Sequence, residues 1–277
     1  MTSATAVSNR TSGQVGGLPV CSSPWSDDML WLFDVNGFLI VENVLSGDEV
    51  ARYLEAARRV AARAGTSSVR PMIEADPVFP ELMDHPITFP IAIKLLGNSL
   101  QVYASTLVRN ARTNAFVSNW HQDGPGYGVR FEDVSYPTPL LQLRMSYFLT
   151  DCLELGQGGL KVIPGSHKSR SALPESLHEM DNVARPVFGK AGSVFIFHNG
   201  LWHAGTENET DNPRYTAHIQ YTPVWVRPVN NHRYSDDFKS SLTPRRRLLL
   251  ADNDNTHDVY HTGAYNYDDD GSISPAR

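Results

Sequence analysis

The chain has 277 residues, of which 41% are hydrophobic and 19% are charged, with a formal net charge of −6 and a pI near 5.9. This composition is that of an ordinary globular protein, and its acidic balance offers no basic surface for nucleic acid. The two cysteines, Cys21 and Cys152, are too few for a disulfide framework and fit a reducing compartment, so we expect a cytoplasmic protein. We expect no membrane anchor and no secretory signal, because no apolar run reaches the roughly 18 residues of a membrane span and the amino-terminal region lacks a basic leader.

The amino-terminal region begins with a segment of low apolar content. Residues 1–24 are predicted to be a disordered leader, because they bury too little apolar surface to offset the entropy lost on ordering. Residues 25–277 are expected to form a single domain with amino-terminal helices and a carboxy-terminal extension, since all-β chains of this size are often one domain. Its first elements are predicted as a short helix at 27–34 and a strand at 38–41.

The clearest helix signal follows. Ser46 and Glu49 form a capping box, in which the hydroxyl accepts from a free backbone N–H and the carboxylate reaches back to the cap residue. Apolar residues then recur at helical spacing until Gly65, which predicts the end of the helix. A loop at 70–80 leads to a second predicted helix at 86–96.

From about residue 100 the pattern changes to short β-type runs separated by Gly and Pro. Several short strands at this spacing predict an all-β core with flanking helices, arranged as an antiparallel barrel or sandwich of the jelly-roll kind. A last helix is predicted near 244–250. The predicted strands span residues 100–109, 115–120, 140–150, 160–163, 193–197 and 215–225.

His121 and Asp123 stand two residues apart, directly before a Gly-Pro-Gly turn. Side chains at i and i+2 of a β-strand point to the same face, so the two residues could hold one metal ion. His203, at the end of another strand-like run, is the preferred third ligand, with His198 as its competitor. Two neutral imidazoles and one carboxylate form the facial triad that holds Fe(II) and leaves coordination positions open. On the pattern alone, Asp123 could equally open a surface turn.

A second group of residues suits the binding of a carboxylate. Arg214 follows His203 at the start of the next predicted strand, and Thr216 shares its face. A guanidinium fork and a hydroxyl in this arrangement could hold one carboxylate bidentately. The alternative for Arg214 is an ordinary surface ion pair.

Together these motifs resemble the phytanoyl-CoA dioxygenase family, a branch of the Fe(II)/2-oxoglutarate-dependent oxygenases. The resemblance covers most of the chain. It is carried by Asn36-Gly37-Phe38-Leu39, by His121-Gln122-Asp123, by a Gly-Gly-Leu-x-x-x-Pro-Gly-Ser-His-Lys segment at 158–168, and by the pair of His203 and Arg214. It implies a double-stranded β-helix, a cupin-like form of the jelly roll. In this segment His167 is expected to be a turn residue and not a ligand.

The resemblance also implies roles for individual residues. His121, Asp123 and His203 would be the iron ligands and the catalytic centre. Arg214 would bind the distal carboxylate of 2-oxoglutarate, with Thr216 as a weaker helper, and Gln122 would lie near the cosubstrate. One departure from the family pattern is Gly205, because the family often has a serine two residues after the distal histidine. A donor to the cosubstrate is then either missing or replaced by Thr206 or Thr216.

The implied reaction uses Fe(II), 2-oxoglutarate and O2, and it oxidises a C–H bond of a small organic substrate with release of succinate and CO2. Hydroxylation is the usual outcome in the family, and secondary metabolism is a fitting context. The carboxylate of Asp123 argues against halogenation, since related halogenases have a small residue in its place. The residues expected to shape the substrate pocket, for each of which core or rim packing is the alternative, are Tyr127, Arg130, Arg144, Tyr147 and Trp202.

Two other functions fit parts of the pattern. A cupin-like isomerase or hydrolase would use Zn or Mn and would need no dicarboxylate clamp, so Arg214 is the residue that separates it from an oxygenase. A catalytically dead binding protein would keep the barrel alone, and the intact set of candidate ligands argues against it.

Overall fold

A computed structural model of the chain describes its fold in nine stretches. Only the last part of the predicted leader is among them, and there Val20–Ser22 forms strand β1 where disorder was expected. The rest of that leader lies outside the described residues. The described stretches are 20–22, 26–112, 118–123, 138–169, 173–177, 183–226, 232–250, 265–267 and 273–275.

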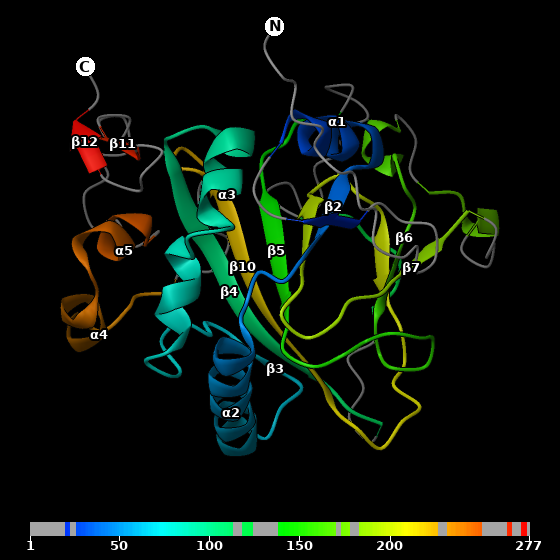
Figure 1. The fold of residues 1–277 in the computed structure, drawn as a ribbon, viewed down its shortest axis with the longest axis horizontal. Helices are drawn as coiled ribbons and strands as arrows, with labels where there is room; N and C mark the ends of the chain where they lie inside the picture. Colours follow the sequence, from blue (N-terminus) through cyan, green and yellow to red (C-terminus); the bar gives the residue numbers. More distant parts are fainter. Residues whose placement is uncertain are drawn as a thin grey trace, which may run out of the picture.

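The centre of the fold is a seven-stranded sheet (Figure 1). Neighbouring strands are antiparallel, except that β1 runs parallel to β2. The long strands β4 and β10 pair along almost their whole length, with a register shift near the end of β10. In spatial order the strands are β1, β2 (Phe38–Glu42), β8 (Val194–His198), β5 (Leu143–Phe148), β10 (Arg214–Pro223), β4 (Leu100–Asn110) and β3 (Ser68–Val69).

A smaller sheet has three antiparallel strands, β7 (Arg185–Val187), β6 (Leu160–Val162) and β9 (His203–Gly205). His121 extends it by an isolated bridge to His203. Alternation along the strands divides the core between the two sheets. On β8, Val194 and Ile196 join the larger apolar cluster, while Phe195 and Phe197 join a second cluster with residues of the small sheet. This two-sheet arrangement is the jelly roll that the sequence predicts.

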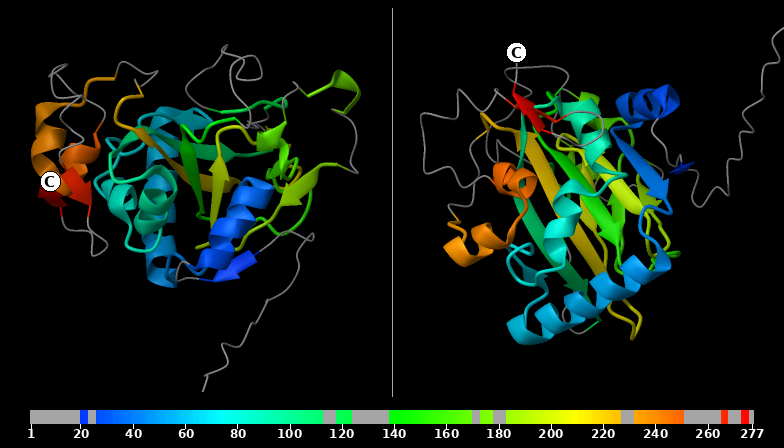
Figure 2. Two further views of the ribbon diagram at one scale, coloured as in Figure 1. Left: turned by 90° about the horizontal axis from the view of Figure 1, so that it is seen from above. Right: turned by 60° about the vertical axis from the view of Figure 1, so that its left-hand side comes forward.

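Helices cover the outer face of the large sheet (Figure 2). The capping box and the end of α2 are confirmed: Ser46 N–H donates to Glu49 at 2.8 Å, and Gly65 ends the helix at a φ of 65°. The helices are α1 (Asp27–Asn36), α2 (Gly47–Ala64), α3 (Phe89–Leu96), α4 (Asp236–Ser241) and α5 (Pro244–Leu249), with short 3-10 turns η1 (Phe79–Asp84), η3 (Ser166–Lys168) and η4 (Glu175–Leu177). A small hairpin of β11 (Tyr265–Tyr267) and β12 (Ile273–Pro275) lies near the carboxy terminus.

Several predicted elements differ from the structure. The strand expected at 115–120 is absent where the chain is described, at Ser118–Trp120, and residues 113–117 lie outside the described part. The three-residue strands β7 and β9 were not predicted, because three residues are too few to show an alternating pattern. None of the helices in the described stretches is long and apolar enough to cross a membrane.

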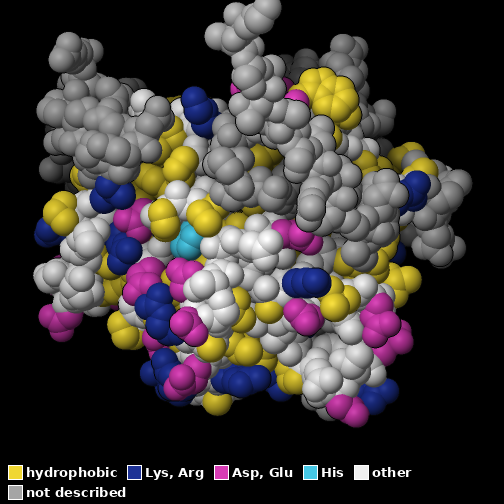
Figure 3. Space-filling view, viewed as in Figure 1, with side chains coloured by type: hydrophobic (Ala, Val, Ile, Leu, Met, Phe, Trp, Pro, Cys, Tyr) yellow, Lys and Arg dark blue, Asp and Glu magenta, His cyan; other side chains and the backbone are white. Residues whose placement is uncertain are grey.

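Charges of both signs share the surface around α2. Figure 3 shows Lys and Arg side chains interspersed with Asp and Glu side chains in this region. Arg52 pairs with Glu81, and Arg59 pairs with both Glu55 and Asp76. The positive charges around α2 are therefore partly balanced by neighbouring carboxylates.

Candidate metal centre and cosubstrate site

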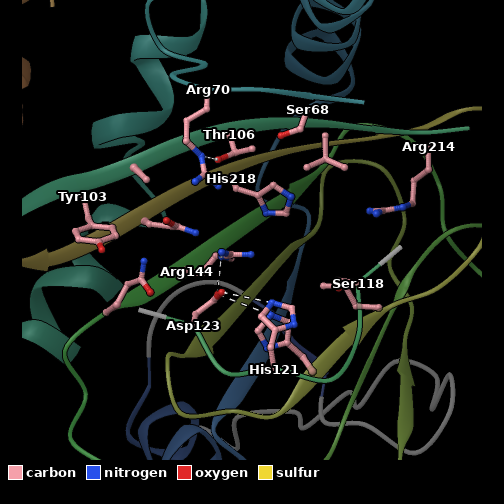
Figure 4. Close-up of a pocket in the computed structure, with 16 residues that line it drawn as sticks. Ser68, Arg70, Tyr103, Thr106, Ser118, His121, Asp123, Arg144, Arg214 and His218 are labelled. Atoms are coloured by element: carbon pink, nitrogen blue, oxygen red, sulfur yellow. Dashed lines mark hydrogen bonds and ion pairs between the residues drawn. The ribbon is translucent and has the colours of Figure 1, made fainter. Parts of the chain in front are cut away.

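The structure brings His121, Asp123 and His203 together (Figure 4). Asp123 Oδ1 lies 3.7 Å from His121 Nε2, and Asp123 Oδ2 lies 3.8 Å from His203 Nε2. One ligand atom from each residue lies within 4.8 Å of the other two. Two imidazole nitrogens and one carboxylate oxygen in this arrangement match the donor set of a facial triad.

Backbone hydrogen bonds hold the three residues in place. His121 and His203 exchange two bonds of 3.0 Å, and Asp123 N–H donates to Asn199 O at 2.9 Å. The segment was predicted to be a strand in which i and i+2 share a face. In the structure the two side chains also converge, but not on a regular strand. A single bridge to His203 fixes His121, and the backbone bond to Asn199 fixes Asp123 beside His121.

Both histidines are oriented by a backbone carbonyl two residues earlier. His121 Nδ1 lies 2.8 Å from Asn119 O, and His203 Nδ1 lies 2.9 Å from Leu201 O. A carbonyl oxygen can only accept, so Nδ1 carries the hydrogen in each ring. The lone pair of each neutral ring is therefore on Nε2, the atom that faces Asp123, and such a carbonyl contact is the usual support of a metal-binding histidine.

Two buried atoms at the centre lack a hydrogen-bond partner within the described structure, namely His203 Nε2 and Asp123 Oδ2. Burial lowers the pKa of His203 to about 4, so its ring is neutral near pH 7. Burial would raise the pKa of Asp123, but the neighbouring groups together outweigh it, Arg144 first and then His203, His121 and Arg70, so the pKa is lowered. A neutral imidazole and an ionised carboxylate with unused lone pairs are the states that a metal ion needs, so these residues fit Fe(II).

Arg144, predicted to shape the pocket, also supports Asp123. Its NH2 group lies 2.9 Å from Asp123 Oδ2, outside hydrogen-bond geometry but within ion-pair distance. The guanidinium lies over the ring of Phe197, 5.4 Å from the ring centre. With its amide oxygen turned toward Arg144, Gln220 accepts from Arg144 Nε at 2.7 Å. The last two contacts hold the guanidinium, which in Figure 4 lies on the opposite side of Asp123 from His121.

Arg214 is the first residue of β10 and is buried, with 6% of its surface exposed. Its Nε donates to Gly158 O, and its NH1 donates to Thr216 Oγ1 at 3.3 Å. Among the residues whose placement is described, no carboxylate forms an ion pair with it. A buried guanidinium without a counter-ion is costly, so this position suits an anionic ligand. The predicted pair of Arg214 and Thr216 is therefore brought together.

The sequence interpretation missed His218, which follows Arg214 and Thr216 on the same face of β10. Its Nε2 lies 3.2 Å from Thr216 Oγ1, and its Nδ1 lies 2.7 Å from Ser146 Oγ. Burial, followed by the charges of Arg144 and Arg214, places the pKa of His218 well below its usual value. The alternation along the strand could have identified His218, because it is the next residue after Arg214 and Thr216 on the same face.

These side chains enclose a cavity of about 290 Å³. The candidate metal ligands and Arg214 line it, as do Gln142 and Gln220. In Figure 4, Arg214 stands at one end of the cavity, and Tyr103 stands at the other.

Two of the predicted substrate residues lie elsewhere. Tyr147 is fully buried in the cluster between the large sheet and the helices, where its hydroxyl lies 2.6 Å from Thr88 Oγ1. Since Arg144 lines the cavity, the pleat of β5 turns Tyr147 to the opposite face, so its prediction is wrong. Trp202 is half-buried and does not line the cavity. Tyr127 and Arg130 lie outside the described residues.

Gln122 does not line the cavity either. Its Nε2 donates to Gly200 O at 2.6 Å and so ties the segment before the candidate ligand Asp123 to the turn before His203. This contact joins the two segments that carry the candidate ligands Asp123 and His203.

A hydroxyl does reach the place where the family pattern has a serine. Gly205 N–H donates to Ser118 Oγ at 2.8 Å, and Ser118 lines the cavity. Thr206, one of the two expected replacements, instead donates to Gly159 O at 3.1 Å and does not line the cavity. The sequence interpretation missed Ser118 because it comes from a different segment, 87 residues from Gly205.

His198, the competitor for the third ligand position, lies apart from the centre. Its Nδ1 accepts from Gly200 N–H at 2.8 Å, and its ring packs 4.9 Å from the ring of His167. His167 lies in the turn η3, as expected, and its Nε2 lies 3.2 Å from Asp34 O. The geometry thus favours His203 as the third candidate ligand.

The chain is similar in sequence to known proteins. The chain is 27% identical over 252 aligned residues to an ectoine dioxygenase of Sphingopyxis alaskensis, covering 74% of this chain and 80% of that one. The structure of EctD from S. alaskensis with 2-oxoglutarate and 5-hydroxyectoine is similar, with a TM-score of 0.61, 26% identity, and coverage of 78% of this chain and 83% of that one.

The fold also resembles that of HygX from Streptomyces hygroscopicus with nickel and 2-oxoglutarate bound. The TM-score is 0.63, the identity is 17%, and the similarity covers 72% of this chain and 88% of that one. Residues 33–216 match the family described as phytanoyl-CoA dioxygenase (PhyH), a span that includes the three candidate metal ligands, Arg214 and Thr216. The chain therefore belongs to the phytanoyl-CoA dioxygenase family.

Proposed function

We propose that His121, Asp123 and His203 hold Fe(II) and that Arg214 holds the distal carboxylate of 2-oxoglutarate, so that the protein is an Fe(II)/2-oxoglutarate-dependent dioxygenase that oxidises a C–H bond of a small organic molecule. One observation carries the proposal. Two imidazoles, whose Nε2 atoms face one carboxylate, share a cavity with a buried arginine that has no counter-ion among the described residues. A dicarboxylate cosubstrate can bind the metal at one end and give Arg214 its counter-ion at the other.

When bound, iron together with 2-oxoglutarate and O2 supplies the oxidation, with succinate and CO2 released. The chain's own residues orient and protect this chemistry. The carbonyls of Asn119 and Leu201 hold the Nδ1 side of each ring, so that each Nε2 is aimed at the metal position. Arg144 keeps Asp123 ionised and holds it in place. Phe197 packs against His203, with ring centres 4.9 Å apart, and excludes water from behind the ligand.

Ser118 and Thr216 are proposed to help Arg214 with the cosubstrate. Thr216 Oγ1 already contacts the guanidinium, and the Ser118 hydroxyl stands at the backbone of Gly205. Ser118 Oγ accepts from Gly205 N–H, which leaves its own hydrogen free to point into the cavity. The hydroxyl that the family places after the distal histidine is thus supplied from another segment.

The substrate is proposed to be a small organic molecule of secondary metabolism. The relatives' names mention small molecules, including ectoine, and the cavity of about 290 Å³ is close to the lower limit of the range for small-ligand sites. A cupin-like isomerase or hydrolase without 2-oxoglutarate remains the rival function, and it gives no role to the buried Arg214.

The test is succinate formation from 2-oxoglutarate by the Fe(II) protein, with and without the change His121→Ala. We expect wild-type protein to form succinate slowly even without substrate and the variant to form none above background. The control is Arg58→Gln, on an exposed part of α2, which should behave as wild type. Equal turnover by wild type and His121→Ala would contradict the ligand role, and no turnover by wild type would favour the rival function.

A further inference from the structure

The cavity carries more positive charge than the cosubstrate needs. Its charged lining residues in the described part of the chain are Arg70, Arg144 and Arg214 against Asp123 alone, which leaves two positive charges in excess. His218 adds no charge near pH 7, since burial holds its pKa well below the usual value. In the proposed function, the charge of Fe(II) cancels that of 2-oxoglutarate. The loaded cavity therefore keeps its excess positive charge, which attracts anions.

Arg70 is the arginine with donors to spare. It directly follows β3, and both it and Ser68 line the cavity. Its Nε donates to Thr106 Oγ1 at 2.9 Å, which anchors the guanidinium across β4. Its two terminal NH2 groups form no hydrogen bond or ion pair with a described residue. Arg144 and Arg214, in contrast, are occupied by Asp123 and by Gly158 and Thr216, respectively.

The position of Arg70 separates it from the proposed cosubstrate clamp. In Figure 4, Arg214 stands at one end of the cavity, whereas Arg70 stands above His218 nearer to Tyr103. The side chain is exposed, so it can meet an incoming ligand. The charge of Arg70 still acts inside the cavity. The pKa of His218 is lowered by burial, by Arg144 and by Arg214, and Arg70 adds a smaller lowering.

We propose that Arg70 binds an oxyanion group of the substrate, such as a carboxylate or phosphonate, and so selects acidic substrates and turns their carbon skeleton toward the metal centre. This inference rests on the proposed function. A planar guanidinium presents two parallel N–H donors that match an oxyanion. Because Thr106 already fixes one edge of the fork, little further side-chain freedom is lost on binding.

The experiment compares acids with their uncharged amides on protein loaded with Zn(II) and 2-oxoglutarate, which does not turn over. The probes are benzoate and cyclohexanecarboxylate, their primary amides, and phenylphosphonate, and binding is followed by saturation-transfer difference NMR. We expect the acids or the phosphonate to bind and the amides not to bind. Arg70→Gln should weaken anion binding by about tenfold to a hundredfold, the effect of a charged hydrogen-bond pair, while Arg58→Gln changes nothing.

A 2-oxoglutarate titration of the anaerobic Fe(II) protein separates a failure of the proposed function from a failure of the role of Arg70. If the wild type fails to bind 2-oxoglutarate, the proposed function fails. If 2-oxoglutarate binds, any of three results overturns only the role of Arg70. Acids and amides bind equally, no anionic probe binds, or Arg70→Gln leaves anion binding unchanged. Loss of 2-oxoglutarate binding in Arg70→Gln would assign Arg70 to the cosubstrate and would also overturn the inference.

Discussion

The guanidinium of Arg144 lies 2.9 Å from Asp123 Oδ2, and both side chains are largely buried, with 19% and 9% of their surfaces exposed. The arginine thus supplies the positive charge that a buried carboxylate needs before any metal arrives. It also leaves Oδ1 turned toward His121. The ion pair therefore pre-orients Asp123 in the candidate metal centre, and a metal bound there would share Asp123 with Arg144.

Arg144→Gln should destabilise the metal-free protein by about 3 kcal/mol, because removing one partner of a buried ion pair leaves the other charge uncompensated. Zn(II) should then stabilise the variant more than it stabilises the wild type, since the metal no longer meets a competing positive charge. Urea unfolding with and without Zn(II) measures both effects. The double variant Asp123→Asn/Arg144→Gln is the control, and it should show no gain from Zn(II). Equal stabilisation of wild type and Arg144→Gln by the metal would contradict this account.

Ser118→Ala should weaken 2-oxoglutarate binding by about tenfold, the effect of one lost hydrogen bond to a charged group. The matched control is Thr206→Val, because Thr206 donates to Gly159 O and does not line the cavity. Titration of the anaerobic Fe(II) protein with 2-oxoglutarate measures the two affinities. If Thr206→Val weakened 2-oxoglutarate binding and Ser118→Ala left it unchanged, Thr206 and not Ser118 would supply the hydroxyl.

Tyr147→Phe should leave 2-oxoglutarate turnover unchanged, because the side chain lies on the helix side of β5. The variant loses the hydrogen bond between Tyr147 and Thr88, so the free energy of unfolding should fall by about 1 kcal/mol. Urea unfolding and succinate formation are measured on the same preparation. A large loss of turnover with unchanged stability would place Tyr147 in the active site after all.

Acid should destabilise the fold through His198. Burial, with a smaller contribution from His167, lowers the pKa of His198 to about 3, below its usual value of 6.5. Between these values the unfolded chain binds more protons than the folded one, so stability falls as the pH drops below about 6.5 and goes on falling toward pH 3. Between pH 7 and pH 5 this group should account for about 2 kcal/mol.

The variant His198→Asn isolates that contribution, because an amide oxygen can still accept from Gly200 N–H but does not titrate in this range. Urea unfolding of both proteins at pH 7 and pH 5 gives the comparison. We expect the loss of stability between the two pH values to be about 2 kcal/mol smaller in the variant. An identical loss in both proteins would show that His198 titrates normally in the folded state.

The sequence could predict the elements that carry local signals. The capped helix α2 has both a capping box and a glycine end, and β4 and β10 are long runs of strand-forming residues. The candidate site was accessible for a similar reason, since His121, Asp123 and the pair of Arg214 and Thr216 each combine a chemical group with a two-residue spacing. His203 needed the family resemblance, because His198 fits the same strand-like run.

What the sequence could not predict depends on register and on contacts between distant segments. The face of Tyr147 follows from which residues of β5 pair with β8 and β10, and a shift of one residue would have turned it into the cavity. The contact between Ser118 and Gly205 joins segments that lie far apart in the chain, and nothing in either segment alone indicates it. The same is true of Arg70, which enters the cavity because β3 pairs with β4.

The most direct test of the central claim is a titration of 2-oxoglutarate into the anaerobic Fe(II) protein, followed by its visible charge-transfer band. Wild type should develop the band with one equivalent of iron. His203→Ala should show none, and Arg214→Gln should need about a hundredfold more 2-oxoglutarate, because it loses the charged partner of the distal carboxylate. A wild type without the band, or an Arg214→Gln protein that binds 2-oxoglutarate as tightly as wild type, would contradict the account.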